Sequence, residues 1–236
     1  MVDANVESES EAGRTVRIPS GSAELEGNLR IPAGASGVAA FIHGSGSSRH
    51  SARNRLVARS MGARGLGTLL FDLLTPEEET IDLLTQAFRF DIRLLAQRTV
   101  DALDWLASLP EVSGLPIGLF GAITGAAAAL AAAARRPERV ACVVCRGGRV
   151  DLAAALLERV QAPTLLIVGG EDSEVLELNR RAYPTIGATQ RSLEVIAGAT
   201  HLFEEPDALE RVCSLAGDWF ERGFAASSPS PRAHPT

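Results

Sequence analysis

Cysteines, aromatic residues and long hydrophobic runs are all scarce in this sequence of 236 residues. It has three cysteines, Cys142, Cys145 and Cys213, an odd number whose spacing is not that of a disulfide framework. No apolar run reaches the roughly 20 residues of a membrane-spanning helix, and no basic-then-apolar segment suggests a signal peptide. These absences favour a chain of the reducing cytoplasm that has no membrane partner.

Clustered positive charge is also missing. The 23 basic and 29 acidic residues give a formal net charge of −6, and the basic residues are scattered along the chain. A nucleic-acid surface needs a basic patch, so we expect no nucleic-acid partner. Apolar residues make up 46% of the sequence, which is enough to bury a sizeable core. A small neutral or modestly polar molecule is the expected substrate or ligand, and nothing in the sequence indicates an oligomeric state.

The spacing of Cys142 and Cys145 forms a C-x-x-C motif, which can hold a metal or carry redox chemistry. This motif, however, lies in the strand-like run 140–145, and residues three apart on a strand face opposite sides. No second C-x-x-C motif or group of histidines completes a zinc site. We therefore interpret the two thiols as core residues, and we expect no metal and no cofactor.

Hydrophobic patterning predicts one α/β domain over residues 14–224, between disordered segments at 1–13 and 225–236. The predicted strands are 14–19, 23–31, 38–42, 67–71, 117–120, 140–145, 164–168 and 191–196. The predicted helices are 52–64, 92–109, 124–135, 152–160, 175–182 and 207–222. Strands that alternate with helices build a mostly parallel sheet of about eight strands with helices on both faces. Residues 72–89 are interpreted as an irregular linker, and no large lid domain is expected. Within it, residues 75–79 could cover the site as a loop or form a solvated acidic turn, and we favour the turn.

Residues with chemical potential follow several of these strands. Ligands bind beyond the carboxyl ends of parallel strands, which is where Ile123, Asp172 and His201 fall. The segment FGAITG at 120–125 lies between a strand and an alanine-rich helix, the context of a nucleophile elbow G-x-S-x-G. Ile123 stands where the serine would be, and we expect a positive φ there. The chain order of elbow, Asp172 and His201 is that of a nucleophile, an acid and a histidine.

Five segments together resemble the small dienelactone-hydrolase-like α/β hydrolases: IHGSGSSRH at 42–50, FDLLTPEEE at 71–79, FGAITG at 120–125, IVGGED at 167–172 and GATHLFEEP at 198–206. The resemblance covers about residues 16–222. It implies an α/β-hydrolase fold and a site for ester or lactone hydrolysis. Members of that family typically carry serine, aspartate and histidine at the positions of Ile123, Asp172 and His201.

Carried over to this sequence, the resemblance makes His201 the general base and Asp172 the group that orients its ring, with Glu171 as the second choice for the acid. It implies an oxyanion hole formed by the backbone N–H groups of Ser45 and Thr124. His43, Gly44 and Gly46 would then shape the substrate side of the loop, although His43 could also simply cap a strand. We interpret Arg49 and Arg53 as ordinary surface charges.

Because an aliphatic side chain cannot attack a carbonyl, Ile123 leaves three readings open. The first is an ester or lactone hydrolase scaffold that has lost its nucleophile. The second is a serine-free enzyme in which His201 and Asp172 act as a general base, in a lyase, isomerase or cofactor-independent oxygenase type of reaction. The third is a non-catalytic binding module.

Overall fold

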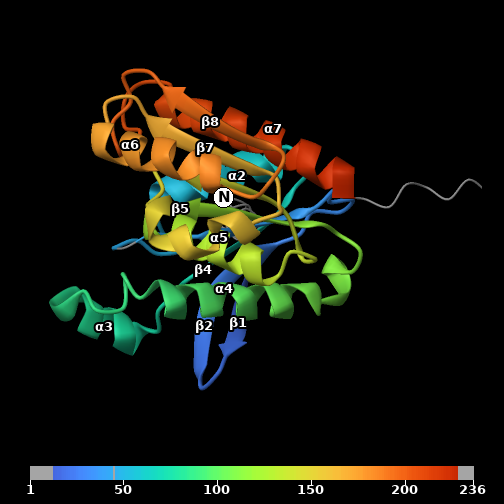
Figure 1. Ribbon diagram of the computed structural model, residues 1–236. Coiled ribbons are helices and arrows are strands. Elements are labelled where there is room, and N and C mark those ends of the chain that lie inside the picture. Colours follow the sequence, from blue (N-terminus) through green and yellow to red (C-terminus); the bar gives the residue numbers. More distant parts are fainter. Residues whose placement is uncertain (1–12, 45, 228–236) are drawn as a thin grey trace, which may run out of the picture.

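An eight-stranded sheet forms the centre of the computed structural model, which describes residues 13–44 and 46–227 (Figure 1). The strands are β1 (Arg14–Ser20), β2 (Ala23–Arg30), β3 (Val38–Ile42), β4 (Gly67–Phe71), β5 (Ile117–Ala122), β6 (Val140–Arg146), β7 (Thr164–Gly169) and β8 (Arg191–Ile196). Their order is β1-β2-β4-β3-β5-β6-β7-β8. The β1–β2 and β2–β4 pairs are antiparallel and the other pairs are parallel. The sheet is therefore mostly parallel, as the sequence predicts.

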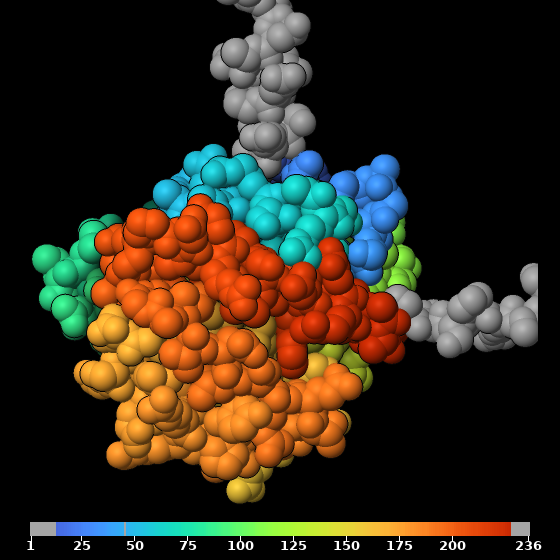
Figure 2. All heavy atoms as spheres, turned by 90° about the horizontal axis from the view of Figure 1, so that it is seen from above, coloured from blue at the N-terminus to red at the C-terminus, as the bar shows by residue number. Residues whose placement is uncertain are grey.

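Helices cover both faces of this sheet. Helix α4 (Ile92–Ala107), α5 (Thr124–Arg135) and the 3-10 helix η2 (Val150–Arg159) pack together on one face, and α6 (Ser173–Ala182) packs against η2 and β7. Helix α2 (Ala52–Ala63) and α7 (Ala208–Ser227) lie side by side on the other face (Figure 2). Two short 3-10 turns lie at Pro110–Val112 and Tyr183–Thr185.

The sheet separates two apolar cores. The run of alanines in α5 is buried against strands β5 and β6 and helix α4, because small side chains let this helix approach the sheet closely. Cys145 belongs to that core, whereas Cys142 packs on the opposite side of β6 among residues of α2 and α7. Both cysteines are fully buried and reduced, which confirms their interpretation as core residues.

One segment differs from its sequence prediction. Residues interpreted as an acidic turn form helix α3 (Pro76–Thr85), which projects beyond the two helical layers (Figure 1). Thr75 and Glu78 form a capping box, in which each side chain accepts a hydrogen bond from the backbone N–H of the other residue, and Pro76 occupies the first turn. Ile81, Leu83 and Leu84 are exposed, so the helix lacks the buried apolar stripe that periodicity detects.

Smaller differences concern η2 and the ends of the chain. The predicted helix at 152–160 is 3-10 in geometry and begins at Val150, and α7 continues to Ser227, three residues into the segment assigned to the tail. The predicted disorder of residues 1–12 and 228–236 lies outside the described residues. None of the helices within 13–44 and 46–227 has the length and apolar character needed to span a bilayer.

The strand order places one crevice in the middle of the sheet. The chain proceeds from β3 to β4 on one side, and the next strand, β5, pairs with β3 on the other side. Loops that leave neighbouring strands in opposite directions open a gap at the carboxyl edge, which is where open α/β sheets bind ligands. His43 follows β3 and Ile123 follows β5, so both lie at this gap.

Candidate functional site

The turn between β5 and α5 is the most constrained part of the site. Ile123 has φ 54° and ψ −119°, which confirms the predicted positive φ, and such a conformation costs a non-glycine residue about 1–3 kcal/mol. Its N–H donates to the carbonyl of Arg146 at 3.3 Å, and its carbonyl accepts from the N–H of Arg149 at 3.0 Å. A Cβ on Gly125 would lie 2.2 Å from the carbonyl oxygen of Ile42, so this side of the turn admits only glycine. The sharp strand-to-helix turn is therefore held by backbone bonds and by close packing.

The loop after β3 packs directly on this turn. A Cβ on Gly44 would lie 2.5 Å from the Cβ of Ile123, so the loop backbone touches the isoleucine side chain. Gly44 and Gly46 line a cavity together with His43 and Thr124. Thr124 is buried at the first position of α5. Ser45, the other predicted oxyanion donor, lies outside the described residues.

Asp172 and His201 lie together at the neighbouring strand ends. The His201 Nδ1 atom is 2.6 Å from the Asp172 Oδ2 atom. A carboxylate can only accept, so the neutral ring carries its proton on Nδ1 and leaves Nε2 as a proton acceptor. Glu171 is exposed, and its N–H donates to the carbonyl of Ala199 at 3.0 Å. The geometry therefore pairs His201 with Asp172 rather than with Glu171.

The end of β6 connects this pair to the turn. A Cβ on Gly147 would lie 3.6 Å from the His201 Nδ1 atom, so the imidazole covers that glycine. The preceding residue, Arg146, supplies the carbonyl that binds the Ile123 N–H. Residues 146–147 therefore contact both residues: the His201 ring packs on Gly147, and the Ile123 N–H is bonded to Arg146. The catalytic roles assigned to these residues from the sequence stay predictions.

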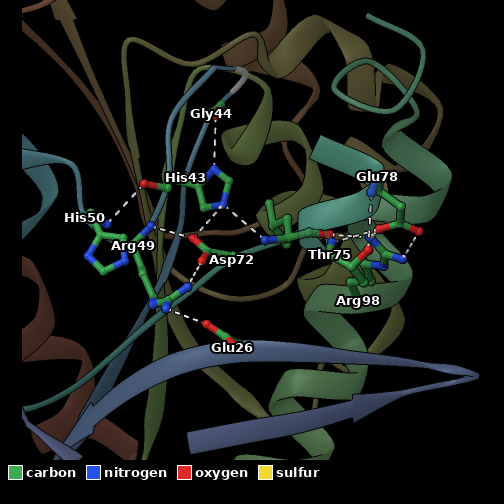
Figure 3. Close-up of polar contacts among 11 residues, drawn as sticks. Glu26, His43, Gly44, Arg49, His50, Asp72, Thr75, Glu78 and Arg98 are labelled. Carbon is green, nitrogen blue, oxygen red and sulfur yellow. Dashed lines mark hydrogen bonds and ion pairs between the residues drawn. The ribbon is translucent and has the colours of Figure 1, made fainter. Parts of the chain in front are cut away.

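His43 is a buried residue with both ring nitrogens occupied. Its Nδ1 donates to the Gly44 carbonyl at 3.1 Å, and its Nε2 accepts from the Leu73 N–H at 3.1 Å (Figure 3). Burial lowers the pKa of this imidazole, and the nearby charges of Asp72 and Glu79 only partly offset the effect. The neutral ring joins the loop after β3 to the loop after β4. His43 therefore shapes the wall of the crevice, rather than exchanging protons there.

Arg49 belongs to a partly buried ion-pair network, so its interpretation as an ordinary surface charge is wrong. Its backbone N–H donates to Asp72 Oδ1 at 2.7 Å, its Nη1 contacts Asp72 Oδ2, and its Nη2 contacts Glu26 Oε2 at 2.6 Å (Figure 3). The His43 Nε2 atom lies 3.8 Å from Asp72 Oδ1. This network fixes His43 and Arg49 against β2 and the end of β4. Arg53 is different, because it is partly exposed and pairs with Glu204 at 3.1 Å.

A second buried arginine fixes helix α3. The Arg98 Nη1 atom donates to the Leu73 carbonyl at 2.6 Å, and both terminal nitrogens of Arg98 donate to the Glu78 carboxylate, at 2.5 and 2.7 Å (Figure 3). The bond from Arg98 lowers the pKa of Glu78 despite the opposing effect of burial. Asp82 accepts bonds from the backbone and side chain of Arg89, which also outweigh its burial and lower its pKa. Helix α3 is thus anchored to the site by charge rather than by apolar packing.

Within the part of the chain that the structure describes, two hollows adjoin the loop that holds Gly44 and Gly46. The first lies between this loop, residues 72–74 and α3, and includes His43, Asp82 and Thr124 in its lining. The second lies between the same loop, the N-terminal end of α2 and the turn at Ile123, and includes Arg53, Arg146 and Leu202 in its lining. Sequence reasoning missed Arg146, Arg49 and Arg98. For Arg146 a signal existed, because it is a charged residue that ends the apolar run VACVVCR at the ligand edge of the sheet.

Known proteins share this architecture. The sequence profile of the dienelactone hydrolase family matches residues 69–221. The crystal structure of a dienelactone hydrolase from Anabaena variabilis is 54% identical and covers 89% of this chain and 96% of its own chain, with a TM-score of 0.86. Est1E from Butyrivibrio proteoclasticus covers 89% of this chain and 99% of its own with a TM-score of 0.74, but at 15% identity it supports the fold alone.

Two Mycobacterium tuberculosis proteins that carry a provisional phosphoribosyl transferase name are each 53% identical over 216 residues. The match spans 91% of this chain and 47% of each relative, so the chain spans about half the length of these curated relatives. Among residues 13–44 and 46–227, no group of three or more histidine, cysteine, aspartate or glutamate side chains could hold a metal ion. The family profile, the high identity to the Anabaena variabilis enzyme and the α/β-hydrolase fold together make this chain a member of the dienelactone hydrolase family.

Proposed function

We propose that this chain is an ester- or lactone-hydrolase scaffold in which Ile123 occupies the position of the nucleophile, so that serine-type hydrolysis is impaired. One observation carries the proposal. Ile123 holds a strained conformation, φ 54° and ψ −119°, in a sharp turn between β5 and α5. G-x-S-x-G elbows place their nucleophile in such a turn. The His201–Asp172 pair is intact on the adjoining strand ends.

The chemistry of the proposal follows from this arrangement. A serine oxygen at position 123 would attack the substrate carbonyl, while Nε2 of His201 took up its proton and Asp172 kept the ring in the required tautomer. The N–H at the start of α5, that of Thr124, is the proposed donor to the developing oxyanion, together with Ser45 of the facing loop. Isoleucine supplies no such oxygen, and the loss of a catalytic serine typically costs about 10⁶ in kcat, or roughly 8 kcal/mol of barrier.

The transferase name of the longer relatives is not carried over to this chain. The profile that matches residues 69–221 is that of a hydrolase family, and the match covers 47% of each of those relatives. The proposal therefore leaves the transferase name with the longer relatives. The activity proposed for this chain remains ester or lactone hydrolysis.

Restoring the nucleophile tests the proposal. The Ile123→Ser variant should hydrolyse small aryl esters or lactones at least a hundredfold faster than the parent chain. It should also be labelled by a fluorophosphonate, with one adduct at residue 123 found by peptide mass spectrometry. Ile123→Ala is the matched control, because it removes the same side chain without supplying an oxygen, and it should show neither gain.

His201 supplies the second control. In the Ile123→Ser background, His201→Ala should abolish both hydrolysis and labelling. Circular dichroism should show that this double variant keeps the α/β-hydrolase fold. An Ile123→Ser protein that folds but is neither labelled nor faster than Ile123→Ala would overturn the proposal. Turnover by the parent chain that disappears with His201→Ala would favour serine-free general-base chemistry instead.

A further inference from the structure

A buried cation without an anionic partner lies beside the turn at Ile123. Arg146 is 5% exposed, and its Nη1 atom is buried with no hydrogen-bond acceptor within residues 13–44 and 46–227. Its guanidinium lies 5.9 Å from the centre of the Phe120 ring, and no carboxylate among those residues forms an ion pair with it. Buried charges in proteins are normally paired, since an isolated one loses its hydration without compensation.

Arg146 nevertheless stays charged at neutral pH. Burial, followed by the like charge of Arg53, lowers its pKa to about 10, which is still well above 7. The other buried arginine near the site, Arg98, is instead fully engaged by Glu78 and the Leu73 carbonyl. The difference shows that Arg146 is not part of the network that anchors α3.

The surroundings of Arg146 are suited to a negative group. The hollow that it lines also contains Arg53 and the residues at the N-terminal end of α2, where the helix dipole is positive. Arg53 forms an ion pair with Glu204. Glu79 lines the same hollow from α3, but it is exposed and is not paired with Arg146. Arg146 therefore provides a cation that no described carboxylate neutralises.

We propose that the hollow between Ile123, Arg53 and Arg146 is a subsite for an oxyanion, either a carboxylate or a phosphate monoester, carried by the ligand of this chain. The guanidinium of Arg146 donates charge-assisted hydrogen bonds to such a group, and Arg53 at the rim supplies further positive charge. The subsite deepens the proposed function, because it places the negative group of an ester or lactone next to position 123.

Binding by the parent chain tests the subsite without any need for turnover. The melting temperature is measured with inorganic phosphate, with benzoate and with uncharged benzamide, at ionic strength held constant with sodium chloride. Phosphate or benzoate should raise the melting temperature in a saturable manner, and benzamide should not. A response to phosphate alone identifies a phosphate group, a response to benzoate alone identifies a carboxylate, and a response to neither overturns the inference.

Variants show where the anion binds. Arg146→Met should weaken binding at least tenfold and should melt no lower than the parent in the absence of anion, because it removes an unpaired buried charge. Arg53→Gln, at a partly exposed position, should weaken binding several-fold and keeps the test valid if Arg146→Met fails to fold. Arg222→Gln is the matched control, because Arg222 also lies over an aromatic ring, that of Trp219, and binding should be unchanged.

Retention of parent affinity by both Arg146→Met and Arg53→Gln would overturn the subsite. Failure of Ile123→Ser to hydrolyse esters, with anion binding intact, would instead overturn the proposed function alone. If the subsite and the proposed function are both correct, Ile123→Ser should prefer an anionic ester over its neutral analogue by about tenfold in kcat/KM. The Arg146→Met substitution should remove that preference.

Discussion

Ile123 holds a backbone conformation that glycine adopts freely and that a β-branched residue adopts at a cost. We therefore expect Ile123→Gly to be more stable than Ile123→Ala by about 1 kcal/mol, although glycine is normally about 0.5–1 kcal/mol less favourable than alanine. Both substitutions remove the side chain, so the comparison isolates the backbone term. Urea denaturation measures it, and an alanine variant that is equal or more stable would contradict the strain.

His43 should make the stability of the protein depend on pH in mildly acidic solution. Its folded-state pKa lies below the ordinary value of 6.5 because the ring is buried, so below pH 6.5 the unfolded chain binds a proton that the folded chain does not. Stability is therefore lost as the pH falls, at up to about 1.4 kcal/mol per pH unit. Glu78 and Asp82 act in the same direction, but only below their ordinary values of 4.5 and 3.8.

Urea denaturation between pH 7 and pH 5 measures this dependence. His43→Gln, whose amide can replace the acceptor for the Leu73 N–H, should flatten the profile. His50→Gln is the control, because His50 is exposed and its loss should leave the profile unchanged. An equal slope for the parent and His43→Gln would assign the pH dependence to another group.

For individual residues, the sequence predicts which of them follow strands, but it does not predict the long-range ion pairs that they form. The positive φ of Ile123 and the proximity of Asp172 to His201 follow from local signals at successive strand ends. The network of Glu26, Arg49 and Asp72 requires β2 to lie beside β4, a strand order that hydrophobic periodicity does not contain. Arg49 therefore could not be distinguished from a surface charge.

The stability of helix α3 depends on its N-terminal end. Its apolar residues Ile81, Leu83 and Leu84 are exposed, so its cap and its ion pairs supply most of its anchoring. Thr75→Ala should destabilise it by about 1 kcal/mol and speed hydrogen exchange within 76–85, while exchange in α5 stays unchanged. Thr80→Ala is the matched control, because Thr80 is exposed and its hydroxyl bonds only the Pro76 carbonyl.

Unchanged hydrogen exchange in Thr75→Ala would show that packing, and not the cap, holds α3.

The existence of this helix could have been predicted from the Thr75-x-x-Glu78 spacing and Pro76, which are local signals. Its length could not, because the exposed apolar positions give no period that points to a core. The strands and the other long helices were predictable, since burial imposes a clear pattern on each of them.

All three thiols are buried in the folded protein. Cys142, Cys145 and Cys213 are buried, and burial raises the pKa of each thiol, that of Cys142 to about 12. We expect no reaction with a disulfide reagent such as DTNB in the native state and three equivalents on unfolding in urea. A Leu84→Cys variant, at a position that is 86% exposed, should react at once. Rapid modification of the parent would show local opening around α7 or β6.

The strand and helix order also governs when the chain can complete its fold during synthesis. Helix α7 at 208–227 packs beside α2 at 52–63, and together they cover Phe41, Phe120 and Cys142. If the sheet forms up to β8 before α7 has left the ribosome, that face presents aromatic and aliphatic side chains to water. Such exposed apolar surface promotes aggregation. We therefore expect the nascent chain to pass through a stage at which a chaperone has an apolar face to bind, and the docking of α7 ends that stage.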